Sequence, residues 1–92
     1  MQVTMRYFGQ LRHLAGRDED TIHLETGVTA LSAIRAAMAP YGEAAALIVM
    51  DASGALRPSL MVLINDAPID KETPPTLQSG DIITLLCAIS GG

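Results

Sequence analysis

The stretch that decides the fold is IITLLCAI, residues 82–89, near the end of the 92-residue chain. Its almost unbroken run of apolar residues is typical of a strand buried on both faces, at the centre of a sheet. Turn residues precede this strand at 79–81 (SGD), and SGG follows it at 90–92. We therefore expect a central last strand that continues into a short glycine tail.

Two alternating segments near the start predict partners for this strand. Residues 2–8 (QVTMRYF) and 21–25 (TIHLE) both alternate between apolar and polar side chains, as half-buried strands do. Between them, residues 9–16 (GQLRHLAG) fit a single helical turn or a loop, and residues 17–20 (RDED) are typical of a polar turn. We expect the two strands to pair as a hairpin.

The clearest helix pattern lies in residues 26–42, TGVTALSAIRAAMAPYG. Thr29 is placed to cap the first turn, and Pro40 and Gly42 are expected to end the helix. A stripe of apolar residues recurs at three- and four-residue spacing and would cover one face of a sheet: Leu31, Ile34 and Met38.

The second half of the chain contains two short apolar runs, residues 46–50 (ALIVM) and 60–64 (LMVLI). Asn65-Asp66 predicts a tight turn after the second run. Pro68 argues against a central strand in the stretch that follows, because proline cannot donate to a ladder. Residues 70–81 are predicted to form a polar loop.

The order strand, strand, helix, strand, loop, strand predicts an α+β fold, a mixed sheet packed against one main helix. If the first and last strands lie side by side in the middle of the sheet, they run parallel. That is the β-grasp, or ubiquitin-like, arrangement. We expect one domain over residues 1–92 with a mobile C-terminal tail at 90–92.

Composition narrows the possible partners. The net charge is −4, and the six basic residues form no run, so a nucleic-acid surface is not expected. No apolar run approaches the ~20 residues of a membrane span, and Arg6 lies where a signal peptide would be apolar. The single cysteine, Cys87, allows no disulfide within the chain and favours a cytoplasmic protein.

Other reactive side chains suggest few sites. Cys87 lies within a predicted strand without a neighbouring base, so we expect a core residue rather than a nucleophile. His13 and His23 lack ligand spacing, and no metal site is expected. The acidic cluster Asp18-Glu19-Asp20 is predicted to be a solvated turn, with a recognition patch for a basic partner as the alternative.

The end of the chain resembles a known family. LQSGDIITLLCAISGG, residues 77–92, is similar to the end of the MoaD/ThiS family of sulfur carriers. The family pattern is a Leu, a Gly-Asp turn, an apolar strand, a small or branched apolar residue, one small residue and a terminal Gly-Gly. Here these positions are Leu77, Gly80-Asp81, residues 82–86, Ile89, Ser90 and Gly91-Gly92.

The resemblance extends over nearly the whole chain. MVLINDAPI, residues 61–69, is similar to the family's strand-turn segment, although Asp66 stands where Gly usually follows the Asn. MRYFGQLRHLAG, residues 5–16, resembles the opening of the MoaD branch. The likeness implies a carrier whose Gly92 carboxylate is adenylated and converted to a thiocarboxylate that donates sulfur in biosynthesis.

The resemblance also implies the partners. The chain lacks the phosphate-binding pattern G-x-x-x-x-G-K, so ATP would be used by an adenylating enzyme of the ubiquitin-activating type, with no cofactor bound to the carrier. The MoaD branch points to molybdopterin synthase, with this chain as the small subunit and the large subunit as sulfur acceptor. Whether it is a carrier subunit or a co-substrate of a sulfur-transfer enzyme, the chain would not be a stand-alone catalyst.

The tail chemistry suits this role. Two glycines without Cβ atoms let the walls of a narrow channel approach Gly91 and Gly92 closely. Ser90 is small, and Ile89 is either an apolar anchor for the partner or the last core residue. One of Met61 and Val62 should face outward, and an apolar patch there would dock the activating enzyme.

Three alternatives stay open at this point. The chain could be a ubiquitin-like modifier joined to other proteins through Gly92; with Lys71 as its sole lysine, self-linked chains have at most one side-chain site. It could carry sulfur for thiamin, cysteine or another thio-metabolite. It could also be a passive interaction domain whose two glycines are accidental.

Overall fold

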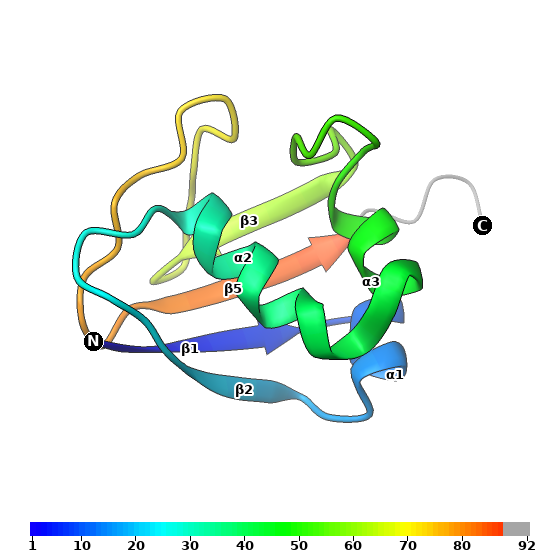
Figure 1. The fold of residues 1–92 in the computed structure, drawn as a ribbon, viewed down its shortest axis with the longest axis horizontal. Helices are drawn as coiled ribbons and strands as arrows, with labels where there is room; N and C mark the ends of the chain where they lie inside the picture. Colours follow the sequence, from blue (N-terminus) through cyan, green and yellow to red (C-terminus); the bar gives the residue numbers. More distant parts are fainter. Residues whose placement is uncertain (88–92) are drawn as a thin grey trace.

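The computed structural model describes residues 1–87, and it confirms the predicted β-grasp arrangement. Five strands form one sheet in the order β2-β1-β5-β3-β4, and β1 and β5 are adjacent and parallel (Figure 1). The other strand pairs are antiparallel. The strands are β1 (Gln2–Tyr7), β2 (Glu19–His23), β3 (Leu60–Ile64), β4 (Ala67–Pro68) and β5 (Ile82–Cys87).

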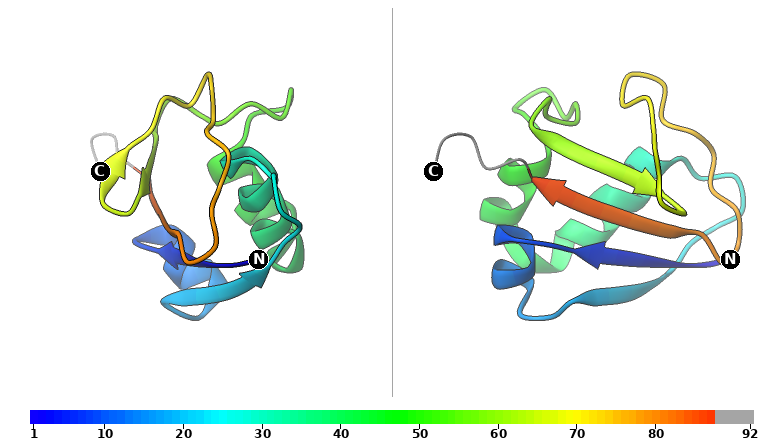
Figure 2. Two further views of the ribbon diagram at one scale, coloured as in Figure 1. Left: turned by 90° about the vertical axis from the view of Figure 1, so that its left-hand side faces the viewer. Right: turned by 180° about the vertical axis from the view of Figure 1, so that it is seen from behind.

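β5 is central, as the sequence predicts, but the expected burial on both faces is confirmed only in part. Ile83 and Leu85 are fully buried on the side that the helices cover. On the other side Thr84 is 7% exposed, whereas Leu86 is 39% exposed. Figure 2 shows the reason, because the helices lie on one face of the sheet and leave the other uncovered. Residues 88 and 89 of the predicted strand lie outside the described part.

The main helix is α2 (Ala30–Met38), and its predicted cap is confirmed. The Thr29 hydroxyl accepts a hydrogen bond from the backbone N–H of Ser32 at 3.3 Å. Ile34 and Met38 are buried as predicted, whereas Leu31 is only partly buried. Three small residues let the helix approach the sheet closely, and all are buried: Ala30, Ala33 and Ala37.

The prediction of a single main helix is incomplete. A short 3-10 turn, η1 (Ala39–Tyr41), follows α2, and Gly42, with φ 84°, turns the chain into α3 (Gly42–Val49). The apolar run at 46–50 is therefore mostly helical, with Ala45 and Val49 buried one turn apart. A third helix, α1 (Gln10–Ala15), closes the end of the sheet beside α3 (Figure 1). None of the helices described could cross a membrane.

The structure confirms one of the two predicted turns between strands and shortens the other. Asn65 and Asp66 form the expected tight turn with φ of 51° and 70°, and the short β4 lies at the sheet edge as Pro68 predicts. The β1–β2 pairing is also confirmed, but β2 begins at Glu19 rather than residue 21. Part of the predicted polar turn at 17–20 is therefore strand, because Glu19 and Asp20 pair with β1.

Candidate functional site

The sequence places the reactive group in the tail, and the structure describes the surface from which that tail continues. Ile89, Ser90, Gly91 and Gly92 lie outside the described residues. β5 ends at Cys87, at the same end of the molecule as α1, α3 and the end of β1 (Figure 1). This end of the domain is therefore the candidate site.

Three exposed apolar side chains, one just after β1, one on β3 and one on β5, form a patch here, which we call the end patch: Phe8, Met61 and Leu86. Met61 and Leu86 are direct partners across β3 and β5. Phe8 follows β1, and its N–H donates to the carbonyl of Leu85 at 3.2 Å. The three residues are 44%, 48% and 39% exposed, respectively. Exposed apolar side chains that lie together on a surface are a common feature of protein interaction sites.

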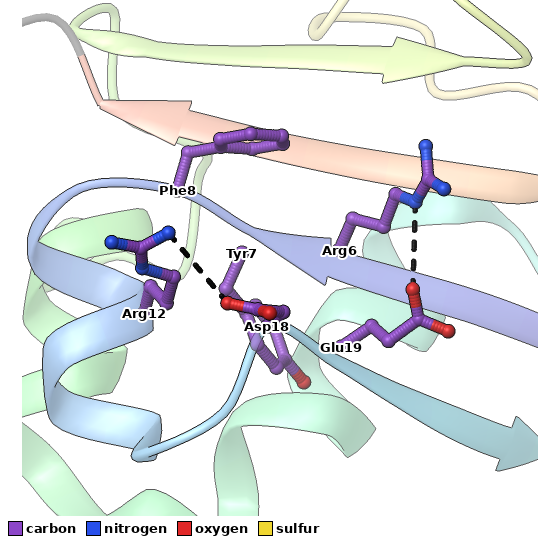
Figure 3. Close-up of a pocket in the computed structure, with 6 residues that line it drawn as sticks. All are labelled: Arg6, Tyr7, Phe8, Arg12, Asp18 and Glu19. Carbon is purple, nitrogen blue, oxygen red and sulfur yellow. Dashed lines mark ion pairs between the residues drawn. The ribbon is translucent and has the colours of Figure 1, made fainter.

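The end patch fits the expectation that Met61 or Val62 faces outward. Val62 is 2% exposed and packs under the helices, while Met61 faces the uncovered side of the sheet. Phe8 belongs to the same side as Arg6, and Figure 3 shows Tyr7 pointing the opposite way. The alternation of side-chain directions in residues 2–8 therefore continues through Phe8, which places an apolar side chain on the same face as the polar Arg6.

A charged margin borders the patch beside Phe8. A hollow of about 370 Å³ is lined by Arg6, Tyr7, Phe8, Arg12, Asp18 and Glu19 (Figure 3). Arg6 pairs with Glu19 and Arg12 with Asp18, each at 3.6 Å between nitrogen and oxygen. All four side chains are about half exposed or more, so the pairs add little stability. Both signs of charge remain available to a partner.

Asp20 has a different role from its two acidic neighbours, and the predicted solvated turn is wrong for it. Its side chain is only 14% exposed. One carboxylate oxygen accepts hydrogen bonds from the hydroxyls of Tyr7 (2.7 Å) and Tyr41 (2.5 Å). The other accepts from the Arg17 guanidinium at 2.9 Å. Asp20 thus connects β1, β2 and η1 behind the end patch.

This network shifts the pKa values of its members. Burial raises the pKa of Asp20, but the hydrogen bonds from Tyr41, Tyr7 and Arg17 outweigh burial, so the pKa lies below its ordinary value. Burial, together with the hydrogen bond to Asp20, raises the pKa of both tyrosines. A buried Tyr hydroxyl needs a hydrogen-bond acceptor. The inward position of Asp20 on β2 is therefore the sequence signal that could have predicted this network.

The remaining candidates are placed as follows. Cys87 packs against the core, as predicted, and burial raises the pKa of its thiol, which disfavours the reactive thiolate. His13 lies on α1, and His23 ends β2. Within residues 1–87, no three His, Cys, Asp or Glu side chains gather where they could hold a metal ion. The end patch combines an apolar centre with a polar margin, an arrangement that protein interfaces share.

Comparison with known proteins gives one family and a consistent fold. The model of the ThiS family matches residues 5–92. Among curated protein sequences, none matches this chain. The crystal structure of SAMP1 from Haloferax volcanii superposes with a TM-score of 0.87 at 22% identity, covering 100% of both chains.

Two solved complexes also contain similar chains. One is the BexX/CysO complex of Amycolatopsis orientalis, with a TM-score of 0.69 at 22% identity, covering 98% of this chain and 99% of that one. The other is the complex of subunits 1 and 2 of the molybdopterin-converting factor from Helicobacter pylori 26695. Its TM-score is 0.54 at 27% identity, with 100% of both chains covered.

Proposed function

The chain belongs to the ThiS family of ubiquitin-like sulfur carriers, and from that premise we propose that Gly92 carries the sulfur as a C-terminal thiocarboxylate. The observation that carries the proposal is the position of the end patch. Phe8, Met61 and Leu86 surround the end of β5, from which the chain continues toward Gly92. A partner that covers the patch would therefore also receive the tail.

The length of the segment after Cys87 is sufficient to bring the Gly92 carboxylate into a partner. Five residues follow Cys87, and fully extended they span at most about 16–18 Å. That reach is enough to carry a carboxylate from the docking surface into a channel of the bound enzyme. Gly91 and Gly92 keep the last part of this segment narrow, and backbone hydrogen bonds from the channel would offset the entropy lost on fixing it.

The proposed chemistry begins with an ionised group, because the reference pKa of a C-terminal carboxyl is about 3.3–3.7. The Gly92 carboxylate attacks the α-phosphorus of ATP held by the adenylating partner, and pyrophosphate leaves. The terminal sulfur of a persulfide then displaces AMP and forms an acyl disulfide. A second thiol cleaves the S–S bond, which leaves the thiocarboxylate on Gly92.

As sulfur acceptor we propose the large subunit of a molybdopterin synthase, with this chain as the small subunit. The support is the MoaD-like opening of the sequence, together with the molybdopterin-converting factor complex, in which a chain of this fold is bound to a second subunit. A carrier serving another thio-metabolite is the alternative to this acceptor, and the BexX/CysO complex adds only that a chain of this fold occurs in a second complex. Isopeptide attachment through Gly92 is a further fate of the same activated group.

The test is conversion of the purified chain. We expect incubation with an adenylating enzyme of the ubiquitin-activating type, ATP and a persulfide donor to replace one C-terminal oxygen by sulfur. Intact mass spectrometry measures the exchange and identifies the last residue of the converted chain. No mass change with enzymes that convert a known carrier would contradict the proposal, and a mass increase on lysines of added proteins would favour the modifier.

Two variants test the position of the reactive group. One residue added after Gly92 moves the carboxylate by about 3.3–3.6 Å, more than the ~1 Å misplacement that costs about 100-fold in rate. We expect conversion to be lost while the melting temperature is unchanged. Gly91→Val keeps the carboxylate in place but adds a branched side chain, and it should also lose conversion. Normal conversion of the extended chain, without trimming, would refute the positional argument.

A further inference from the structure

Lys71 is the sole lysine of the sequence, and its ammonium group lies in a cradle of backbone carbonyls. Its Nζ donates hydrogen bonds to the carbonyl oxygens of Arg57 (2.8 Å), Pro58 (2.9 Å) and Leu60 (2.5 Å). An ammonium group has three N–H donors, so all of its donors are used. The three carbonyls belong to the turn that leads into β3.

The cradle has a structural role. Leu60 also donates its N–H to the carbonyl of Arg57 at 3.0 Å, which closes the turn below Lys71. The lysine follows β4 in sequence, so its side chain joins the loop after β4 to the start of β3. The group that would be the natural acyl acceptor of a lysine is therefore engaged in holding two segments together.

Acylation of Lys71 would require this arrangement to open. The nitrogen must first lose a proton to expose its lone pair. It must then attack an activated carbonyl carbon, so that a C–N bond forms and the bond to the leaving group breaks. In the structure each hydrogen points to a carbonyl oxygen, and the same oxygens lie around the nitrogen. An acyl group cannot reach Nζ until the side chain has left the cradle.

The other basic side chains offer no substitute. The remaining five are arginines, whose guanidinium groups stay protonated in proteins and lack a nucleophilic nitrogen. We propose that Lys71 is a carbonyl cap rather than an acyl acceptor, and that the chain is therefore a one-way acyl donor whose activated copies do not form isopeptide bonds with one another. The absence of links between copies rests on the proposed activation of Gly92, whereas the low reactivity of the Lys71 amine does not.

The test uses a chemical acylating agent and needs neither ATP nor a partner. Folded protein is treated with limiting N-hydroxysuccinimide acetate, and peptide mass mapping follows acetylation of Lys71. The matched control is the double variant Lys71→Arg/Gln78→Lys, which keeps one lysine but moves it to an exposed position in the same loop. Mapping also separates Lys71 from the amino group of Met1, which donates to the Leu24 carbonyl at 2.6 Å.

We expect Lys71 to react about tenfold or more slowly than the lysine introduced by Gln78→Lys, because several hydrogen bonds must open first. In concentrated urea the two lysines should react at equal rates, which verifies that the fold causes the difference. Equal rates in the folded proteins would overturn the proposal. So would copies of the wild-type chain joined at Lys71 after incubation with the adenylating enzyme and ATP. Failure to form a thiocarboxylate would leave the acetylation result standing.

Discussion

The two faces of the sheet carry similar apolar side chains, which are buried on one face and exposed on the other. Along β5, Leu85 is fully buried and its neighbour Leu86 is 39% exposed. The same contrast separates Val62 from Met61 on β3, and Tyr7 from Phe8 at the end of β1. Each pair consists of adjacent residues, and adjacent residues of a strand point to opposite faces. One face stabilises the domain, and the other stays exposed to solvent.

The difference teaches that hydrophobicity alone does not mark the core. Leu85 and Leu86 are chemically identical, and only the position of α2 and α3 on one face decides which of them leaves water (Figure 2). Burial of a leucine side chain contributes about 1.5–3 kcal/mol to the free energy of folding. At the end patch, the same free energy is gained only if another molecule covers the exposed side chains.

The largest expected effect comes from a direct test of this contrast. Leu85→Ala should lower the free energy of unfolding by about 2–5 kcal/mol, because it removes buried methyl groups and leaves a cavity. Leu86→Ala should change it by no more than about 0.5 kcal/mol. Urea unfolding followed by circular dichroism measures both. Comparable losses in the two variants would break the comparison, because they would place Leu86 in a packed environment.

The second prediction concerns the hydrogen bonds that the buried Tyr7 hydroxyl needs. Asp20→Asn removes the negative charge from the acceptor of the Tyr7 and Tyr41 hydroxyls. We expect the free energy of unfolding to fall by about 1–3 kcal/mol at neutral pH. Asp18→Asn is the matched control and should be almost neutral, since the Asp18 side chain is 81% exposed. Denaturant unfolding of the two variants beside the wild type measures the difference.

The pH dependence has a defined sign. Because the pKa of Asp20 is lowered in the folded state, its contribution is fully present above the unfolded value of about 3.9. It is lost as the pH falls through the lower folded value. The gap between wild type and Asp20→Asn should therefore narrow below about pH 4. A gap that stays constant down to the acid transition would show that the charge of Asp20 is not what stabilises the network.

The last expected change in free energy is in binding. Leu86→Asp should weaken association with the proposed adenylating enzyme about tenfold, or by about 1.4 kcal/mol, because a charge would be placed at the centre of an apolar contact. Its melting temperature should hardly change. Leu14→Asp is the control, since Leu14 has nearly the same exposure, 40%, but lies on α1 rather than on the sheet. Calorimetric titration compares the two, and equal losses would mean that the partner does not select the sheet face.

Several elements of the fold could be predicted because their signals are local. The alternation of residues 2–8, the cap at Thr29 and the Asn65-Asp66 turn each depend on neighbours a few positions away. Helix α3 was missed because its apolar residues are continuous over 46–50, and a short apolar run fits a strand as well as a helix. The role of Asp20 was missed because its hydrogen-bond partners come from β1 and η1, far along the chain.

The sequence by itself determined the family, the central last strand and the identity of the proposed reactive residue, Gly92. These depend on composition and order, which a linear pattern records. Only the tertiary structure decided which face of β5 is open, and that Phe8, Met61 and Leu86 meet there. A period of two assigns residues to two faces but does not say which face the helices will cover. That choice is made by the packing of α2 and α3, which buries one face as the core and leaves the end patch exposed on the other.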